Sequence, residues 1–467
     1  MWWEIAISRS PEIGRHIKAF ELQIIRGYEG DTTPTERGAE PRRHCTKKHM
    51  KGLHMVYGVK FLKRKLAAKS LRVKIRYKQY EQKKLDQTIG IVIPPELSER
   101  YRSVLGWCAK AVDAMADRLI FRGFANDLYD FDTVFKTNNP DILFDSAILS
   151  ALIASCSFIY IAQSEDSDIP RLQVIDAANA TGIIDPITGL LTEGYAVLEE
   201  DEFGKAKIEA YFTADKTTIT TVDQDGKKTP IDYYHNAGHP LLVPIVHRPD
   251  SVRPFGRSRI TRAAEYWQRY AKRTLERADV TAEFYSFPQK YVLGMSSEAE
   301  QLDTWTATIT SMLRIDKDSD GDKPTLGQFT STSMAPFTEQ LRMAASGFAG
   351  ETGLTLDDLG FVKENPSSAE AIKASHETLR LAANKAQRSF NSGLINVGYL
   401  ATCLRDNFPY KREAFSNVEV MWEPTFAPDA ATIGLIGDAA IKINQAVPGY
   451  FTGDSLRALT GIKGTSQ

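Results

Sequence analysis

Two histidines are the first candidates for chemistry, because their spacing is one that zinc sites use. His235 and His239 are four residues apart, as on one face of a helix. Gly238 and Pro240 prevent a regular helix there, and no glutamate follows the first histidine as it does in zinc proteases. We therefore expect ordinary loop histidines and no metal.

A second candidate is an acidic run that begins like a calcium-binding EF-hand loop. Residues 316–321 read Asp-Lys-Asp-Ser-Asp-Gly, with carboxylates at positions one, three and five and glycine at six. The twelfth position should be a bidentate glutamate and is Gly327, and Pro324 lies between. An exposed acidic turn without a metal cofactor is the better interpretation.

The cysteines and the common enzyme motifs give no catalytic site. Cys45, Cys108, Cys156 and Cys403 are far apart and form no C-x-x-C pair, and the last three lie in apolar runs typical of packed thiols. Neither an ATP-binding P-loop, a dinucleotide-binding glycine motif nor a G-x-S-x-G elbow is present. We predict a protein that is not an enzyme and binds no cofactor. A hydrolase or transferase with an unrecognised site stays as an alternative.

Charge is distributed unevenly along the chain. The net charge is −1, yet residues 41–84 contain 16 Lys or Arg and one acid, Glu81. Such asymmetry favours contact with nucleic acid, an acidic protein surface or an anionic membrane, unless the segment is merely a solvated arm. A DNA-binding architectural protein inside the cell, using residues 41–84, is therefore the second functional hypothesis.

The length and composition fit a soluble protein of about three domains. The chain has 467 residues, of which 42% are hydrophobic and 25% charged. The longest uncharged stretch, residues 146–164, changes midway from a helical to a β-branched pattern, so we expect a buried helix and a strand and no membrane span. We therefore expect a protein that is cytosolic or is assembled in a cytosol.

The first half of the chain combines helices with a run of short strands. Residues 1–50 are poorly patterned. Residues 57–68 repeat like a helix and 71–77 alternate like a strand, and residues 240–254 look extended because of their prolines. Further helices are predicted at 96–119 and 131–152. Strands are predicted at 158–161, 172–175, 183–184, 194–198, 208–212 and 217–222, with turns too short for anything but an antiparallel layer.

The second half is dominated by long helices. Apolar residues recur at helical spacing for about 25 residues from Arg257, again over 336–351, and then over 367–405, where Ser367 and Glu370 form a capping box. Residues 284–333 between the first two helices are irregular, and residues 352–365 form a loop. A strand at 418–422 and short helices after Pro428 and Thr452 follow. The fold class is α+β.

Five short motifs in this order resemble the portal proteins of tailed double-stranded-DNA bacteriophages of the siphophage type. The resemblance covers about Val59 to Ile462. The motifs are Gly106–Asp113 with Asp117–Leu119, Pro254–Ile260, Gly353–Gly360, Asn365–Ile372 and Trp422–Pro424.

The resemblance implies a portal-type fold with long stem and wing helices, a β-rich wing and a small α/β clip, assembled as a ring. It assigns residues 51–255 to the wing, 256–283 to the first stem helix, 284–335 to the clip and 336–351 to the second stem helix. It then assigns 352–366 to the tunnel loop, 367–406 to a long wing helix and 407–467 to the wing end and a short crown. Residues 1–50 match nothing in the family.

The same resemblance implies a homododecameric ring at one capsid vertex, through which DNA is packaged and ejected. Its partners would be double-stranded DNA bound without sequence specificity, the large terminase, a head-tail adaptor, and capsid and scaffolding proteins, with no membrane. The protein would be found in the virion, and in the host cytoplasm during assembly. Diffuse contacts with the DNA backbone let DNA slide, whereas base readout would arrest it. The channel residues implied are Asp357, Asp358, Lys363, Asn365, Arg269, Lys272 and Arg273.

Overall fold

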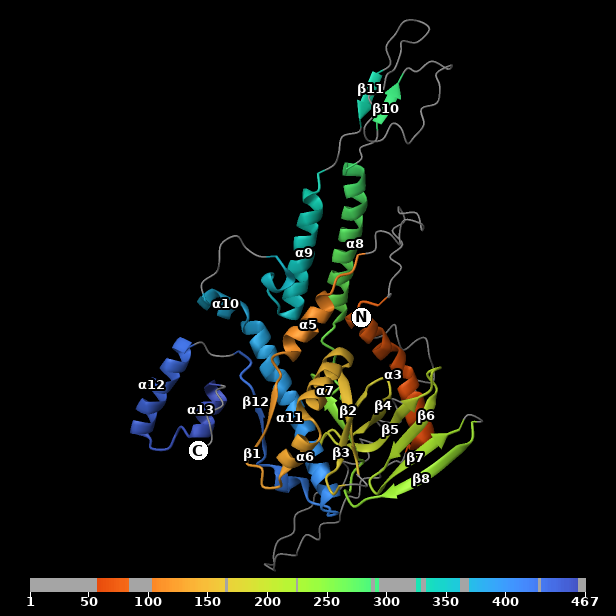
Figure 1. Cartoon of the computed structure of the whole chain (residues 1–467), viewed down its shortest axis with the longest axis vertical. Helices are drawn as coiled ribbons and strands as arrows, with labels where there is room; N and C mark the ends of the chain where they lie inside the picture. Colours follow the sequence, from red (N-terminus) through yellow and green to blue (C-terminus); the bar gives the residue numbers. More distant parts are fainter. Residues whose placement is uncertain are drawn as a thin grey trace, which may run out of the picture. The chain divides into compact units, whose positions relative to one another are not determined.

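The computed structural model describes residues 57–83, 103–163, 167–223, 226–286, 290–293, 325–328, 333–361, 369–426 and 430–460. The chain divides into residues 1–55 and residues 56–467, and every element below belongs to the second unit (Figure 1). The predicted extension at 1–50, the acidic turn at 316–321 and the capping serine Ser367 lie outside the described residues.

The basic segment forms one continuous helix, α3 (Gly58–Tyr80), so the strand predicted at 71–77 is wrong. The alternation of Leu71, Val73 and Ile75 does not mark one buried face, because Val73 is buried whereas Leu71 is 69% and Ile75 39% exposed. The helical face that carries Leu62, Leu66 and Val73 packs on the body instead. Helical periodicity therefore governs the whole segment.

Two antiparallel sheets replace the single β layer that the pattern suggests. Their antiparallel pairing is as predicted. The smaller sheet has the order β3 (Arg171–Asp176), β2 (Cys156–Ala162), β9 (Leu242–Val246). The larger has the order β4 (Ala180–Ile184), β5 (Leu191–Glu200), β6 (Ala206–Phe212), β7 (Lys216–Val222), β8 (Lys228–Tyr234).

Three strands differ from the sequence prediction. β9 is a regular strand although Pro244 lies in it, paired opposite Phe158, and its place at the edge of the sheet tolerates a residue without an N–H. β8 was not predicted, because all of its residues are exposed and leave no alternating pattern. β1 (Phe121–Ala125) was not predicted either and pairs with β12 (Glu419–Trp422).

The helices around the sheets are shorter than predicted, for local reasons. The helix expected at 131–152 is two, α6 (Phe131–Thr137) and α7 (Pro140–Ala154), because Asn139 adopts a left-handed conformation before Pro140. The long helix expected at 367–405 is interrupted at His376 into α10 (Ala369–Ser375) and α11 (Glu377–Arg405). α5 (Trp107–Ala116) begins after Gly106.

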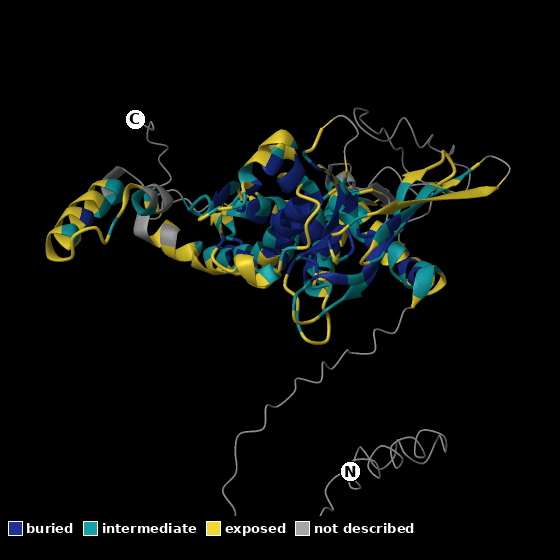
Figure 2. Cartoon of the chain, turned by 90° about the horizontal axis from the view of Figure 1, so that it is seen from below, coloured by how far each residue is buried: buried dark blue, intermediate teal, exposed yellow. Residues whose placement is uncertain are grey.

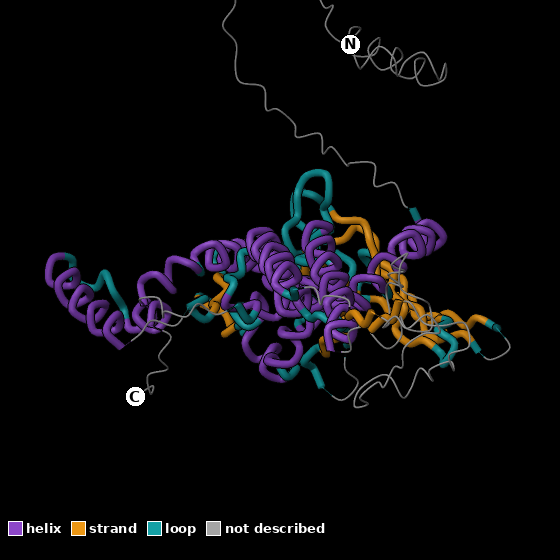
Figure 3. The backbone as a smooth tube through the Cα atoms, turned by 90° about the horizontal axis from the view of Figure 1, so that it is seen from above, coloured by secondary structure: helices purple, strands orange, loops and turns teal. Residues whose placement is uncertain are grey.

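One hydrophobic core joins these helices to the sheets (Figure 2). α7 packs on β2 and β3, α11 packs on β9 and β2, and α3 packs on β4 and β5 of the larger sheet. Figure 3 shows from above how helices and strands lie against one another. The largest fully buried side chains are Phe131, Phe135, Phe144, Phe158, Phe212, Phe348, Phe390 and Phe415.

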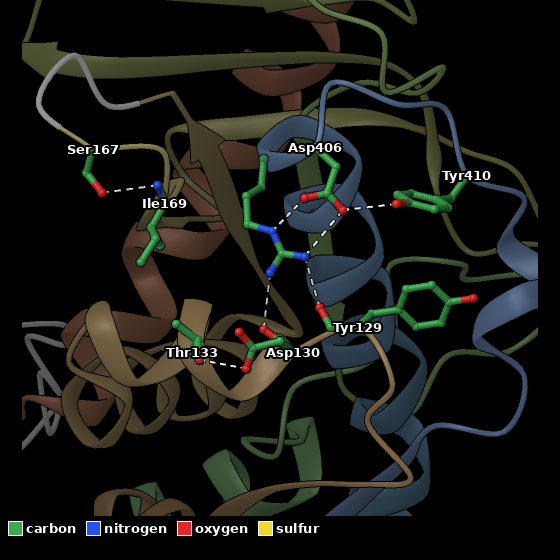
Figure 4. Close-up of polar contacts among 8 residues, drawn as sticks. Tyr129, Asp130, Thr133, Ser167, Ile169, Asp406 and Tyr410 are labelled. Atoms are coloured by element: carbon green, nitrogen blue, oxygen red, sulfur yellow. Dashed lines mark hydrogen bonds and ion pairs between the residues drawn. The ribbon is translucent and has the colours of Figure 1, made fainter.

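Polar contacts fix the end of α11 to the segment before α6. The guanidinium of Arg405 donates to the carbonyl oxygens of Tyr129 (3.1 Å) and Asp130 (3.4 Å) and forms an ion pair with Asp406 (2.8 Å). The Tyr410 hydroxyl donates to the other oxygen of Asp406 at 3.1 Å (Figure 4). The long helix is thus tied at its C-terminal end to the first half of the chain.

The remaining described elements are a helix pair, a strand pair and the C-terminal helices. α8 (Arg262–Ser286) packs along α9 (Ala335–Thr352), and β10 (Lys290–Leu293) pairs with β11 (Thr325–Gln328). A 3₁₀ turn, η1 (Asp357–Leu359), follows α9, and a second, η2 (Arg412–Phe415), follows α11. The last described elements are the helices α12 (Ala430–Ala446) and α13 (Gly453–Thr460). Among the described helices, none has both the length and the apolar character needed to cross a bilayer.

Candidate nucleic-acid interface

The α8–α9 pair is held together by small and aromatic side chains. Ala264 and Ala271 of α8 and Ala344, Ala345 and Phe348 of α9 are buried. The two helices lie close together at Gly347, where an added Cβ would lie 2.4 Å from the ring of Trp267. Glycine at this position lets the indole lie against the backbone of α9, so the two helices approach closely.

The face of α8 opposite this contact carries a row of arginines, which we call the arginine stripe: Arg262, Arg269, Arg273 and Arg277. All four are exposed, as is Tyr266 among them. Spacings of seven, four and four residues keep them on one side of the helix, over about 22 Å at 1.5 Å per residue. Lys272, also predicted to face DNA, lies half-buried at the side of the stripe.

Most of the stripe has no acidic partner in the described part of the chain. Arg269 lies 3.5 Å from Glu265 one turn earlier. Arg262, Arg273 and Arg277 form no ion pair with another described residue. Exposed arginines with free donors are suited to phosphate, which a guanidinium binds through two parallel hydrogen bonds.

Residues 254–260, which we call the base of α8, lie just before this helix and attach its first turn to the body. Gly256 has φ +70°, and an added Cβ would lie 2.0 Å from the carbonyl oxygen of His247. The Ser258 hydroxyl donates to the carbonyl of Ile153 at 2.6 Å, and the Arg259 N–H donates to that of Leu152 at 2.8 Å. The last carbonyl groups of α7 have no N–H partner within their own helix, and this motif supplies donors to two of them.

Arg259 connects the base to both neighbouring helices. Its side chain is buried and donates to the carbonyl oxygens of Ala111 in α5 and Thr352 at the end of α9. Burial lowers the pKa of the guanidinium to about 10, so it remains a cation at neutral pH. Thr261 adds a hydroxyl bond to Glu351 at 2.8 Å. The start of α8 and the end of α9 are therefore fixed to the same point of the body.

The loop after α9 begins at this base, and its acidic residues differ in role. Asp358 accepts bonds from the N–H and hydroxyl of Thr355 at 2.8 and 2.9 Å, and lies 3.8 Å from His376. Asp357 is exposed. The Asp358 carboxylate is therefore occupied within the loop, and only Asp357 of the two is free to meet a ligand. Lys363 and Asn365 lie outside the described residues.

The structure agrees with the expectation of inert cysteines. Cys108, Cys156 and Cys403 are buried, and burial raises their pKa to about 12, 11 and 11, which keeps the thiols protonated. His235 and His239 lie in the loop after β8. No group of three potential metal ligands occurs in the ranges that the structure describes.

Two members of the arginine stripe were missed at the sequence level. Arg269 and Arg273 were predicted, whereas Arg262 and Arg277 were not. Helical spacing alone predicts that all four arginines share one face, opposite Ala264 and Ala271.

Comparison with known proteins gives a consistent set of relatives. No family model matches the chain. The chain is 27% identical over 401 residues to the portal protein of Mycobacterium phage L5, covering 81% of this chain and 79% of that protein. It is 24% identical over 387 residues to the portal protein of Mycobacterium phage D29, covering 78% and 77%.

Solved structures with a weak likeness come from gene transfer agent particles. One chain of a native particle has 13% identity and a TM-score of 0.40, covering 84% of this chain and 100% of that one. One chain of a neck computed with C12 symmetry has 12% identity and a TM-score of 0.41, covering 79% and 94%. By its similarity to these two phage proteins over about four-fifths of its length, the chain resembles the siphophage-type portal proteins.

Proposed function

We propose that the protein is a portal subunit that forms a ring-shaped channel for DNA at one capsid vertex. The observation that carries the proposal is the similarity to two phage portal proteins across about four-fifths of the chain. Neither relative is an enzyme by name, and we propose a structural role without catalysis for this chain as well.

The ring would be built from the regions that the sequence resemblance assigns. In this proposal, residues 51–255 form the wing, α8 and α9 the stem, and the segment between them the clip. Residues 352–366 form the tunnel loop, α10 and α11 the long wing helix, and the rest the wing end and crown. The fixed base around Arg259 supports this division, because it ties both stem helices to the wing.

DNA would pass the stem through weak contacts with its phosphates. The arginine stripe supports this role because its guanidiniums are exposed and three of them are unpaired in the described part of the chain. Such contacts are electrostatic and independent of sequence, so they do not hold DNA in one register. Asp357, Lys363 and Asn365 would line the narrower passage at the loop.

The portal would dock the large terminase during packaging and a head-tail adaptor afterwards, and contact capsid and scaffolding proteins during assembly. It would reside in the virion after assembly in the host cytoplasm. These partners follow from the proposed portal role itself.

The first test is the native mass of the purified protein, measured by mass photometry together with negative-stain images. We expect a particle of about twelve protomers with a central hole. A monomer or dimer that binds duplex DNA would instead favour the architectural DNA-binding protein that the basic segment suggests.

The loop assignment has a separate test. The variant Asp357→Ala/Lys363→Ala/Asn365→Ala should form rings of normal mass and package less DNA in a packaging assay. Asp358 is left intact because its carboxylate orders the loop. Normal packaging by this variant would contradict the tunnel-loop assignment without affecting the ring.

A further inference from the structure

The basic helix α3 uses a large part of its charge to bind its own body. Lys65 and Lys69 lie over the ring of Phe255, with their Nζ atoms 5.0 and 4.4 Å from its centroid, and Arg76 donates to the Ala154 carbonyl at 2.7 Å. Lys63 forms an ion pair with Glu209. These residues hold the helix in place, so they are not a surface for nucleic acid.

A second set of residues faces solvent, and we call it the outer face of α3. Three of its members are basic and three are apolar. They are Lys60, Arg64, Lys78, Phe61, Leu71 and Ile75. Phe61, Leu71 and Ile75 are 43%, 69% and 39% exposed, and the ring centroids of Tyr57 and Phe61 lie 4.8 Å apart.

The composition of this face favours a protein as its partner. Exposed apolar side chains interleaved with cations are typical of protein interfaces, in which aromatic residues and arginine are enriched. The arginine stripe of α8 differs, since one tyrosine is the only large apolar residue along it. Phosphates would satisfy Lys60 and Arg64 but leave Leu71 and Phe61 in water.

The same chain carries a projection of complementary character at the turn between β5 and β6. This acidic hairpin consists of Glu199, Glu200, Asp201, Glu202 and Phe203. Phe203 at its tip is 85% exposed.

Two of its four carboxylates already bind groups within the hairpin. Asp201 accepts from the N–H groups of Phe203 and Lys205 at 2.9 and 2.7 Å, and Glu199 pairs with Lys207. Glu200 and Glu202 form no ion pair with another described residue.

The outer face of α3 turns away from the sheet to which this hairpin belongs. Glu193 of β5 accepts from the backbone N–H groups of Tyr57 and Gly58, at 2.8 and 2.9 Å, and so fixes the first turn of α3 on the sheet. Leu62 and Leu66 are buried on the sheet side. The hairpin and the outer face therefore meet only between two copies of the chain.

We propose that the acidic hairpin of one copy docks on the outer face of α3 of the next copy. Phe203 would pack on Phe61, and Glu200 and Glu202 would pair with Lys60 and Arg64, which lie within one turn of Phe61 in α3. The two surfaces differ, so the contact is heterologous, and repeating it generates a ring when the rotation from one copy to the next closes. This inference rests on the ring of the proposed function and names one interface within it.

Charge reversal tests the contact directly. Glu200→Lys/Glu202→Lys and Lys60→Glu/Arg64→Glu should each raise the protein concentration needed for half-maximal assembly by roughly tenfold or more, because each places like charges opposite one another. Combining all four changes in one chain should restore assembly. An equimolar mixture of the two variants should also assemble, since each hairpin then finds an opposite charge on its neighbour. Mass photometry over a range of protein concentrations measures assembly for each variant, for the combined variant and for the mixture.

Controls separate this interface from the ring and from folding. Glu413→Lys/Glu419→Lys changes the same number of exposed charges elsewhere and should assemble normally. Circular dichroism must match the wild type for each variant. Rings that form unchanged in both reversals would overturn the interface and leave the portal proposal standing. A wild type that never assembles would overturn both. Loss of duplex DNA binding in Lys60→Glu/Arg64→Glu, with assembly intact, would assign the outer face to DNA.

Discussion

Gly256 lies against His247, the residue that follows β9, and its backbone has a φ of +70°. An alanine there would be strained in the left-handed region and would place Cβ 2.0 Å from the His247 carbonyl oxygen. The clash is with backbone, so no side-chain rotation relieves it. The whole motif that supports α8 would have to shift.

We therefore predict that Gly256→Ala lowers the free energy of unfolding by about 3 kcal/mol or more, measured by urea titration with tryptophan fluorescence. Gly204→Ala is the matched control, because Gly204 has φ +73° and nothing within 4 Å of an added Cβ. The control should lose only about 1 kcal/mol. Equal losses in both variants would show that the close approach to His247 does not matter.

His247, which lies beside this motif, makes the free energy of unfolding depend on pH in a direction that can be predicted. The ring is buried, its Nδ1 donates to the Arg257 carbonyl at 2.7 Å, and burial lowers its pKa from 6.5 to about 3. Arg259 and Arg248 act in the same direction. The unfolded chain therefore binds a proton between these values that the folded chain does not, so stability is present above pH 6.5 and decreases as the pH falls.

The expected loss from this group is about 2 kcal/mol between pH 7 and pH 5. Urea titrations at both pH values, on the wild type and on His247→Gln, measure it. The difference between pH 7 and pH 5 should be smaller in the variant by about that amount. An unchanged difference would mean that His247 is protonated in the folded protein.

Sequence reasoning at this scale found the residues of the motif at 254–260 but not their roles. Ser258 and Arg259 act on carbonyls of Ile153, Leu152, Ala111 and Thr352, which are about 90 to 150 residues away in the chain. Such partners have no local signal, because any main-chain carbonyl can accept a bond. The occupied carboxylate of Asp358 was equally invisible, since exposure and spacing alone made it resemble Asp357.

At the scale of elements, periodicity predicted long helices well and strands only where one face is buried. α9 was predicted at 336–351 and lies at Ala335–Thr352, because Leu341, Ala344, Ala345 and Phe348 share one face. β8 was missed because both of its faces are exposed, and the strand predicted within α3 arose from exposed Leu71 and Ile75. Burial, which decides such cases, depends on tertiary contacts.

The α8–α9 contact gives a prediction in which two neighbouring glycines behave oppositely. Gly347→Ala should lower the free energy of unfolding by about 1–3 kcal/mol, because the new methyl group would meet the Trp267 ring at 2.4 Å. Gly350→Ala should raise it by about 0.5–1 kcal/mol, since Gly350 lies in the same helix with nothing within 4 Å of an added Cβ.

Thermal and urea unfolding of both variants measure this contrast, and tryptophan fluorescence reports whether the Trp267 environment changes. Two stabilised variants would mean that α8 and α9 do not pack at Gly347. Two destabilised variants would mean that the exposed side of α9 is covered by another part of the protein.

At the scale of the whole molecule, the net charge is −1, and the basic residues fall into groups with different roles. Several cations of α3 hold their own helix, the outer face of α3 combines cations with apolar groups, and the arginine stripe consists mainly of cations. Composition alone could not separate these roles, because they depend on which side of each helix is covered. The basic segment that first suggested DNA binding is thus a weaker candidate than α8.

The arginine stripe therefore gives the last prediction. Arg269→Gln/Arg273→Gln/Arg277→Gln should weaken binding to duplex DNA of any sequence and reduce the salt dependence, by about 0.9 in the slope of log K against log salt for each phosphate that is no longer bound. Fluorescence anisotropy on two duplexes of unrelated sequence, each over a series of salt concentrations, measures both effects. Ring mass should not change, since these side chains are exposed on the face opposite α9.

The matched control removes the same charge from other exposed positions, Lys110→Gln/Lys385→Gln/Arg388→Gln. If total charge alone governed binding, both triple variants would show the same decrease in affinity and in salt slope. A decrease confined to the stripe variant, equal on both duplexes, would mean that phosphates lie along α8 and that bases are not read. DNA held in this way is free to move, because each displacement along the helix axis exchanges one set of bound phosphates for an equivalent set.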